Sequence, residues 1–225
     1  MTNKIKLAVF DLDGTLVNSV CDLADATNKA LEELGLPTFE TDRYYHFVGN
    51  GTRKLCERVL PEELRSDGQI DRLHEMFARN YERCCFNKTR PYDGISELLD
   101  TLRERGIRCA VASNKPDSFS CRIVKHFFGD TFDLVVGKRE GVPTKPDPAV
   151  IQYIMTALGF TADETVIIGD SDVDIITARN TGTRSIGCVW GFRGEAELRN
   201  AGCTNIANVP TDIAAIIDRL NKTEN

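Results

Sequence analysis

The apolar residues of this chain follow two kinds of pattern. Short continuous runs, such as Leu7 to Phe10 and Thr165 to Ile168, are typical of strands that are buried on both faces of a sheet. Between such runs, apolar residues recur every three or four positions, which is typical of helices with one buried face. Strands that alternate with amphipathic helices predict an α/β fold with a doubly wound parallel sheet.

The alternation is regular from residue 95 to the end of the chain, and the first strand belongs to the same sheet. The predicted strands cover residues 7–10, 107–112, 132–136, 165–168 and 184–189, with an edge strand near 204–206. The predicted helices cover residues 95–105, 117–128, 148–158, 173–181, 195–200 and 211–220.

Residues 17–86 show only helical patterns, and we expect no strand in this interval. Three helices are predicted, over residues 20–34, 52–60 and 69–85. The turn residues of NKTRPYDG, at 87–94, then mark the return to alternation. We therefore predict an α/β core domain of residues 1–16 and 92–225, and a helical cap domain of residues 17–91. Because the cap is inserted directly after the first strand, it can close over whatever that strand carries.

Composition narrows the possible partners. The 225 residues are 41% hydrophobic and 28% charged, which is ordinary for a globular protein, and the net charge of -6 argues against nucleic acid or an anionic membrane surface as a partner. No apolar run resembles a signal peptide or a membrane span, so we expect a cytoplasmic protein. Monomer and homodimer both remain open. The eight cysteines include no CxxC pair, and we expect them to be reduced rather than zinc ligands.

Two carboxylates, Asp11 and Asp13, directly follow the first strand. In a parallel sheet, ligands bind in the crevice beyond the carboxyl ends of the strands. Two acids one residue apart are unfavourable there unless they share a divalent cation or a proton. The alternative is a solvated acidic turn.

The string DLDGT, at residues 11–15, resembles the first motif of the haloacid dehalogenase-like superfamily of phosphohydrolases. The resemblance implies that Asp11 is the nucleophile that attacks phosphorus and that Asp13 is the general acid and base. It also places Thr15 beside them in the site, within the turn.

Three later segments resemble the remaining motifs of the same superfamily, in the expected order. AVASNK, at 110–115, offers Ser113 and Asn114 as donors to phosphoryl oxygens, although Ser-Asn after a strand is commonly a helix cap. TKPDPAVI, at 144–151, supplies Lys145 as a fixed cation, where a solvated lysine is the alternative.

The fourth segment, TVIIGDSDVD at 165–174, carries Asp170 and Asp174. The resemblance implies Mg²⁺ as the cofactor, held by the carboxylates of Asp11 and Asp170 and by the backbone carbonyl of Asp13, an all-oxygen set that suits a hard cation. Asp174 either supports the metal or orients Lys145. The activity implied is hydrolysis of a small phosphorylated metabolite through an aspartyl-phosphate intermediate.

The cap is expected to choose the substrate. HFVGNGTRK, at 46–54, is a glycine-flanked loop that opens a helix, and its amides together with Arg53 could hold a small anion such as a carboxylate. Its VGNG part, with candidate contacts Gly49, Asn50 and Gly51, resembles the cap segment of phosphoglycolate phosphatases, as do the stretches FDLVVG and GCVWGFR. The resemblance implies 2-phosphoglycolate as substrate. A glycine-rich turn without a ligand is the plain alternative.

Other functions remain as alternatives. A β-phosphoglucomutase, or a sugar-phosphate or pyrophosphate phosphatase, would use the same scaffold. A signalling receiver domain also gathers acids, a hydroxyl and a lysine around Mg²⁺, but it lacks a helical insert after the first acids. No GxxxxGK[ST] loop is present, which argues against a nucleotide triphosphatase of the P-loop class.

Overall fold

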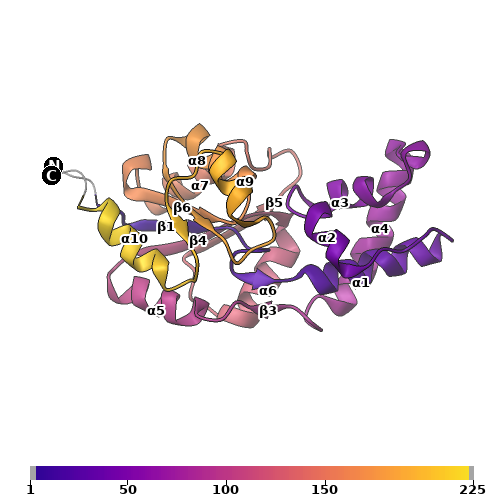
Figure 1. Cartoon of the computed structure of the whole chain (residues 1–225), viewed down its shortest axis with the longest axis horizontal. Coiled ribbons are helices and arrows are strands. Elements are labelled where there is room, and N and C mark those ends of the chain that lie inside the picture. The colour runs from indigo at the N-terminus through magenta and orange to yellow at the C-terminus, as the bar shows by residue number, and fades with distance from the viewer. Residues whose placement is uncertain (1–3, 223–225) are drawn as a thin grey trace.

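The computed structural model describes residues 4–222, and its centre is a parallel sheet of six strands with helices on both faces (Figure 1). In spatial order the strands are β5 (Leu134–Lys138), β4 (Arg108–Pro116), β1 (Leu7–Phe10), β6 (Thr165–Gly169), β7 (Arg184–Cys188) and β8 (Ile206–Ala207). The predicted doubly wound α/β fold is confirmed.

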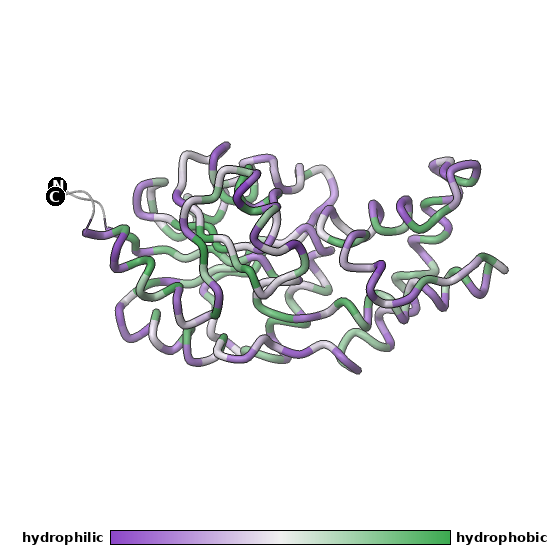
Figure 2. Tube along the Cα trace, viewed as in Figure 1, coloured by the Kyte–Doolittle hydropathy of each residue, from purple (hydrophilic) through white to green (hydrophobic). Residues whose placement is uncertain are grey.

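Side chains of β1 alternate between the two faces of the sheet, as the pleat of a strand requires. Leu7 and Val9 pack against one helical layer, and Ala8 and Phe10 against the other. The first layer contains α7 (Ala149–Leu158) and α8 (Asp172–Thr181); the second contains α5 (Ile95–Glu104), α6 (Asp117–Phe128) and α10 (Asp212–Leu220). Figure 2 shows the hydrophobic residues gathered along the strands between these layers.

The register of the central strands brings their carboxyl ends together. Phe10, the last residue of β1, lies beside Val111 of β4 and Ile168 of β6. The backbone N–H of Asp11 donates to the carbonyl of Ile168 over 2.8 Å, which fixes the next residue of the chain at the edge of the sheet. Residues that follow β1 and β6, although far apart in the sequence, therefore meet at one place.

The segment between β1 and α5 forms a helical block, residues 20–84, that extends from one end of the sheet (Figure 1). Its helices are α1 (Val20–Glu33), α2 (Thr41–Phe47), α3 (Thr52–Val59), the short η1 (Glu62–Leu64) and α4 (Asp67–Cys84). The block has its own hydrophobic cluster, in which Tyr44, Phe77 and Tyr81 are fully buried.

Two features of this region differ from the sequence-based expectation. β2 (Val17–Asn18) pairs with β3 (Arg90–Pro91), so the prediction that no strand occurs in residues 17–86 is wrong. A strand of two residues is too short to produce a hydrophobic pattern. The helix α2 was not predicted either. The two chain segments that link the block to the core are also joined by Asp22 of α1. Its carboxylate accepts hydrogen bonds from the backbone N–H groups of Lys88 and Thr89.

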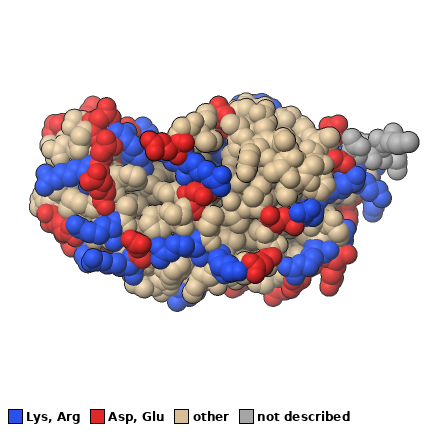
Figure 3. Space-filling view, turned by 180° about the vertical axis from the view of Figure 1, so that it is seen from behind, with Lys and Arg blue, Asp and Glu red and all other residues tan. Residues whose placement is uncertain are grey.

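The remaining expectations concern the surface and the ends. On the face drawn in Figure 3, Lys and Arg side chains are interspersed with Asp and Glu. Within residues 4–222, no helix is both long enough and apolar enough to cross a membrane. None of the eight cysteines, all of which lie in the described residues, forms a disulfide. The ends of the predicted core domain, residues 1–3 and 223–225, lie outside the described residues.

Candidate active site

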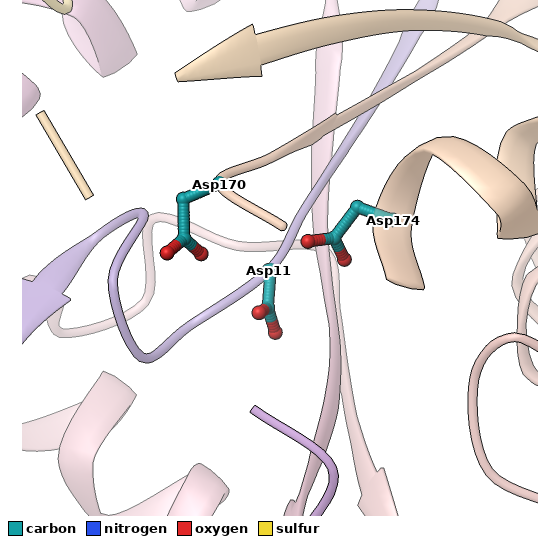
Figure 4. Close-up of side chains that lie close together, drawn as sticks. All are labelled: Asp11, Asp170 and Asp174. Carbon is teal, nitrogen blue, oxygen red and sulfur yellow. The ribbon is translucent and has the colours of Figure 1, made fainter. Parts of the chain in front are cut away.

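Three carboxylates converge at the carboxyl edge of the sheet. Asp11 follows β1, Asp170 follows β6, and Asp174 lies in the first turn of α8, with one oxygen of each lying within 4.8 Å of the others. Figure 4 shows that the three side chains lie close together. Asp170 and Asp174 are buried, whereas the Asp11 side chain is 14% exposed.

Burial and mutual repulsion disfavour the ionised forms of these acids. Burial raises the pKa of Asp11 from 3.8 to about 7, opposed by the ammonium of Lys145 and reinforced by the charge of Asp174. Burial, together with Asp174 and Asp11, also holds the pKa of Asp170 well above its ordinary value. Positive charge placed close to these three acids would therefore stabilise their ionised forms.

Lys145 supplies part of that charge. Its Nζ lies 2.7 Å from an oxygen of Asp174 and 3.0 Å from an oxygen of Asp11. Burial opposes the charge of Lys145, but the two carboxylates outweigh this effect and raise its pKa. The other oxygen of Asp174 accepts from the backbone N–H and the hydroxyl of Ser171, which together form the capping box of α8. Asp174 thus contacts Lys145 through one oxygen and the start of α8 through the other.

The donor set fits a divalent cation. Carboxylate oxygens are the ligands that hard cations prefer, and the two oxygens of Asp170 are oriented by the hydroxyl of Thr15 and the N–H of Phe192. Two glycines allow the backbone to approach this acid. A Cβ atom at Gly14 would lie 2.4 Å from Oδ2 of Asp170, and one at Gly191 would lie 2.2 Å from its Cβ. We conclude that Asp11 and Asp170 can hold Mg²⁺.

Asp13 lies beside this cluster rather than within it. Its carboxylate accepts a hydrogen bond of 2.5 Å from the hydroxyl of Ser19, and both of its oxygens contact Nζ of Lys115, at 2.9 and 3.0 Å. Lys115 was not among the residues predicted to form the site. Its side chain is 1% exposed and lies 4.6 Å from the centre of the Tyr81 ring of α4.

A cleft of about 400 Å³, including the open space at its mouth, separates these groups from the helical block. The sheet contributes charged and polar side chains to its wall, and the block contributes apolar and small residues. The lining residues are Asp11, Asp13, Ser113, Asn114 and Lys115 from the sheet, and Leu23, Val48, Gly49, Gly51, Thr52 and Leu55 from the block.

The predicted phosphate-binding residues and two of the four predicted loop contacts lie at this cleft. Ser113 and Asn114 line it, and the amide of Asn114 donates to the carbonyl of Lys145 over 2.9 Å. Gly49 and Gly51 line it from the block.

Three other predicted residues are not part of the lining. Thr15 is buried and donates its hydroxyl to Asp170 instead. The side-chain oxygen of Asn50 accepts from Arg58. The guanidinium of Arg53 pairs with Asp67 and Asp71, two acids of α4, so it is directed to the surface of the block.

A family model described as haloacid dehalogenase-like hydrolase matches residues 8–188. The chain is 34% identical to a phosphoglycolate phosphatase of Colwellia psychrerythraea, in a match that covers 88% of this chain and 90% of that protein. It is also 34% identical to a phosphoglycolate phosphatase of Psychrobacter arcticus, with 96% of each chain covered.

Solved structures agree with this relationship. The structure superimposes on a protein of Lactobacillus delbrueckii subsp. bulgaricus with a TM-score of 0.90 and 31% identity, over 95% of this chain and 98% of the other. A haloacid dehalogenase-like family hydrolase of Streptococcus pneumoniae gives a TM-score of 0.84 and 25% identity, over 94% and 97%. Both likenesses extend over the sheet and the helical block together.

Proposed function

The chain belongs to the haloacid dehalogenase-like hydrolase family and is a phosphatase, and we propose that it hydrolyses 2-phosphoglycolate to glycolate and phosphate with Mg²⁺ as cofactor. The main observation in support of this reaction is that Asp11, Asp170, Asp174 and Lys145 lie together at the base of one cleft. The names of the relatives support the substrate.

Asp11 is the nucleophile of this proposal. Its carboxylate lines the cleft, and the ammonium of Lys145 at 3.0 Å favours its ionised form. Attack on phosphorus forms an aspartyl-phosphate on Asp11 and releases the alkoxide of glycolate. Ser113 and Asn114, which line the same cleft, donate hydrogen bonds to the phosphoryl oxygens, and Lys145 stabilises the charge that develops there.

Asp13 is the general acid and base. It starts the reaction in its protonated form, gives that proton to the leaving alkoxide and, as the resulting carboxylate, takes one from the water molecule that attacks the aspartyl-phosphate. The contacts of its carboxylate with Ser19 and Lys115 hold it at the wall of the cleft, next to Asp11 in the chain but outside the buried cluster.

A bound Mg²⁺ would neutralise the acids and stabilise negative charge on the transferring phosphoryl group. The residues that would hold it are Asp11 and Asp170 through their carboxylates and Asp13 through its backbone carbonyl. Asp174 is the remaining acid of the cluster, and its ion pair with Lys145 favours the orienting role over direct ligation.

The helical block serves as the cap in this proposal, with the core formed by residues 1–16 and 92–225 and the cap by residues 17–91. Separate hydrophobic clusters in the sheet and in the block support this division. Because the sheet supplies the groups that recognise phosphate, selection of the leaving group falls to the rest of the cleft.

The test is phosphate release from a panel of phosphorylated metabolites, with and without Mg²⁺. We expect the highest kcat/KM for 2-phosphoglycolate and loss of turnover in the presence of EDTA. A preference for a sugar phosphate or for pyrophosphate would refute the substrate while keeping the chemistry. Conversion of a sugar phosphate that needs a bisphosphate activator would indicate a mutase instead.

A further inference from the structure

The lining of the cleft contains one cationic side chain, Lys115, among the residues that the structure describes. The other cations nearby are engaged elsewhere. Lys145 lies between Asp11 and Asp174, and Arg53 pairs with acids of α4. Arg193 donates to the carbonyl of Val48 and pairs with Glu197. A second negative charge on a substrate would therefore meet Lys115.

The position of Lys115 is structurally enforced. The residue follows Ser113 and Asn114 in β4, and only 3% of its surface is exposed. One side of its ammonium faces the carboxylate of Asp13, and another faces the ring of Tyr81 at 4.6 Å. That ring is itself fixed by stacking on Phe77 and by an edge contact with Phe119. A cation is attracted by the face of an aromatic ring, so Tyr81 helps to hold the charge in place.

Burial of the Lys115 ammonium is unfavourable, and an apolar side chain would fill the same space without that penalty. Removing an ammonium from water is unfavourable, and the attraction of a carboxylate partner can fall short of that penalty. The only carboxylate in contact with Lys115 in the described residues is that of Asp13, which must turn to the ester oxygen of the substrate when it acts as general acid.

The geometry suits a carboxylate on the leaving group. In 2-phosphoglycolate a single CH₂ group separates the ester oxygen from the carboxylate. A group that approaches Asp13 through the ester oxygen therefore brings its carboxylate to the neighbourhood of Lys115. The opposite wall, formed by Leu23, Val48 and Leu55, offers no charge to balance it.

We propose that Lys115 is the specificity-determining residue for substrates whose leaving group carries a carboxylate. Its ammonium exchanges Asp13 for the carboxylate of the bound substrate, while Tyr81 supports it from the cap. This inference rests on the proposed function, and it adds the residue that distinguishes an anionic from a neutral leaving group.

The experiment compares 2-phosphoglycolate with 2-hydroxyethyl phosphate, which replaces the carboxylate by a neutral CH₂OH group. We expect the wild type to prefer the anionic substrate. In Lys115→Met, the ratio of the two kcat/KM values should fall by at least about thirtyfold, because a buried charge contact made with only one of the substrates is lost. Lys115→Gln, which is neutral but keeps a hydrogen-bond donor for Asp13, should lose the preference too.

Lys125→Met is the matched control. Lys125 lies on α6, its side chain is 66% exposed, and it pairs with Asp130 away from the cleft. This variant loses the same charge and should keep the wild-type ratio.

Equal losses on both substrates in Lys115→Met and Lys115→Gln would overturn the inference, since Lys115 would then act only through Asp13. A wild type that hydrolyses both substrates equally well would also overturn it, while the phosphatase function stood. A wild type that releases phosphate from neither substrate in the presence of Mg²⁺ would refute the proposed function itself, and the inference with it.

Discussion

The two walls of the cleft differ in how they are built. The sheet side carries charged groups that contact one another, such as Lys145 between Asp11 and Asp174, whereas the cap side presents Leu55, Val48 and the backbone of a glycine loop. Charged groups at fixed distances perform chemistry, and apolar walls select by shape. The difference indicates that reactivity belongs to one wall and selection largely to the other, with Lys115 as the charged exception.

The strongest test of this division is Asp11→Asn. The variant keeps the shape of the nucleophile but cannot form the aspartyl-phosphate, so we expect kcat to fall by at least about four orders of magnitude. Stability should change little, because the substitution removes one of three mutually repelling acids. Phosphate release and thermal unfolding measure the two quantities.

Asp100→Asn, an exposed acid of α5 paired with Arg103, is the control and should match the wild type in both measurements. Turnover by Asp11→Asn near the wild-type rate would show that Asp11 is not the nucleophile.

Lys145→Met addresses the charge balance of the same wall. It leaves Asp11 and Asp174 without their shared cation, and we expect a loss of about a hundredfold to a thousandfold in kcat. Measured without divalent cations, the free energy of unfolding should fall by about 3–5 kcal/mol, because a buried pair is broken. Circular dichroism during denaturant titration measures this loss.

The double variant Lys145→Met/Asp174→Asn separates the two effects. It removes one of the two unpaired acids, so we expect part of the stability to return while activity stays low. Recovery of activity in the double variant would contradict the assignment of Lys145 to the transferring phosphoryl group.

The sheet wall could be predicted from the sequence better than the cap wall. Asp11, Ser113 and Asp170 could be placed together because parallel strands end at one edge, and each residue directly follows a predicted strand with a clear hydrophobic pattern. The role of Asp174 beside Lys145 followed from the resemblance. These placements depend on local pattern and on a general property of parallel sheets.

The cap wall could be predicted less well because it depends on contacts between distant segments. Lys115 is buried because Tyr81, 34 positions earlier in the chain, covers it, and no local pattern marks such a pair. Arg53 was expected at the cleft, but Asp67 and Asp71 attract it to the surface of the block. The short β2 and β3 lack enough residues to show a period.

Cation binding on the sheet wall should depend on pH. The pKa of Asp11, about 7 without a cation, lies above its ordinary value of 3.8, so below pH 7 a proton must leave before the cation binds. We expect Mg²⁺ affinity to fall by up to about tenfold for each pH unit below 7 through Asp11, and the raised pKa of Asp170 should act in the same direction. The same raised pKa makes the cation-free protein lose stability as the pH rises from about 4 to 7, since the folded state binds the proton more tightly.

Calorimetric titration with Mg²⁺ between pH 5.5 and 8.5 measures the affinity, and thermal unfolding in EDTA over the same range measures the stability. A constant affinity over this range would show that Asp11 is already ionised at pH 5.5, contrary to the effect expected from its burial.

The smallest effect on activity is expected for a substitution in the loop after β7, which contacts both the cap and the acid cluster. Arg193, in the loop after β7, donates to the carbonyl of Val48 in the cap over 2.7 Å, and the ring of its neighbour Phe192 contacts Tyr45. The N–H of Phe192 donates to Asp170, so this loop contacts the cap and the acid cluster at once. In Arg193→Met we expect kcat/KM for 2-phosphoglycolate to fall about threefold to tenfold, since one charge-assisted hydrogen bond of several cap contacts is lost.

The control for this loop is Arg199→Met, which removes an exposed arginine of α9 (Gly194–Asn200) that pairs with Glu195. The emission of Trp190, the single tryptophan of the chain, reports on the same loop, because its indole N–H donates to the carbonyl of Thr15. If the loop couples the walls, Arg193→Met should change both kcat/KM and the shift in Trp190 emission on adding Mg²⁺, and Arg199→Met should change neither. A lower kcat/KM with an unaltered emission shift would mean that Arg193 affects the cap alone. The response of the acid cluster to its cation would then not depend on the contact between Arg193 and the cap.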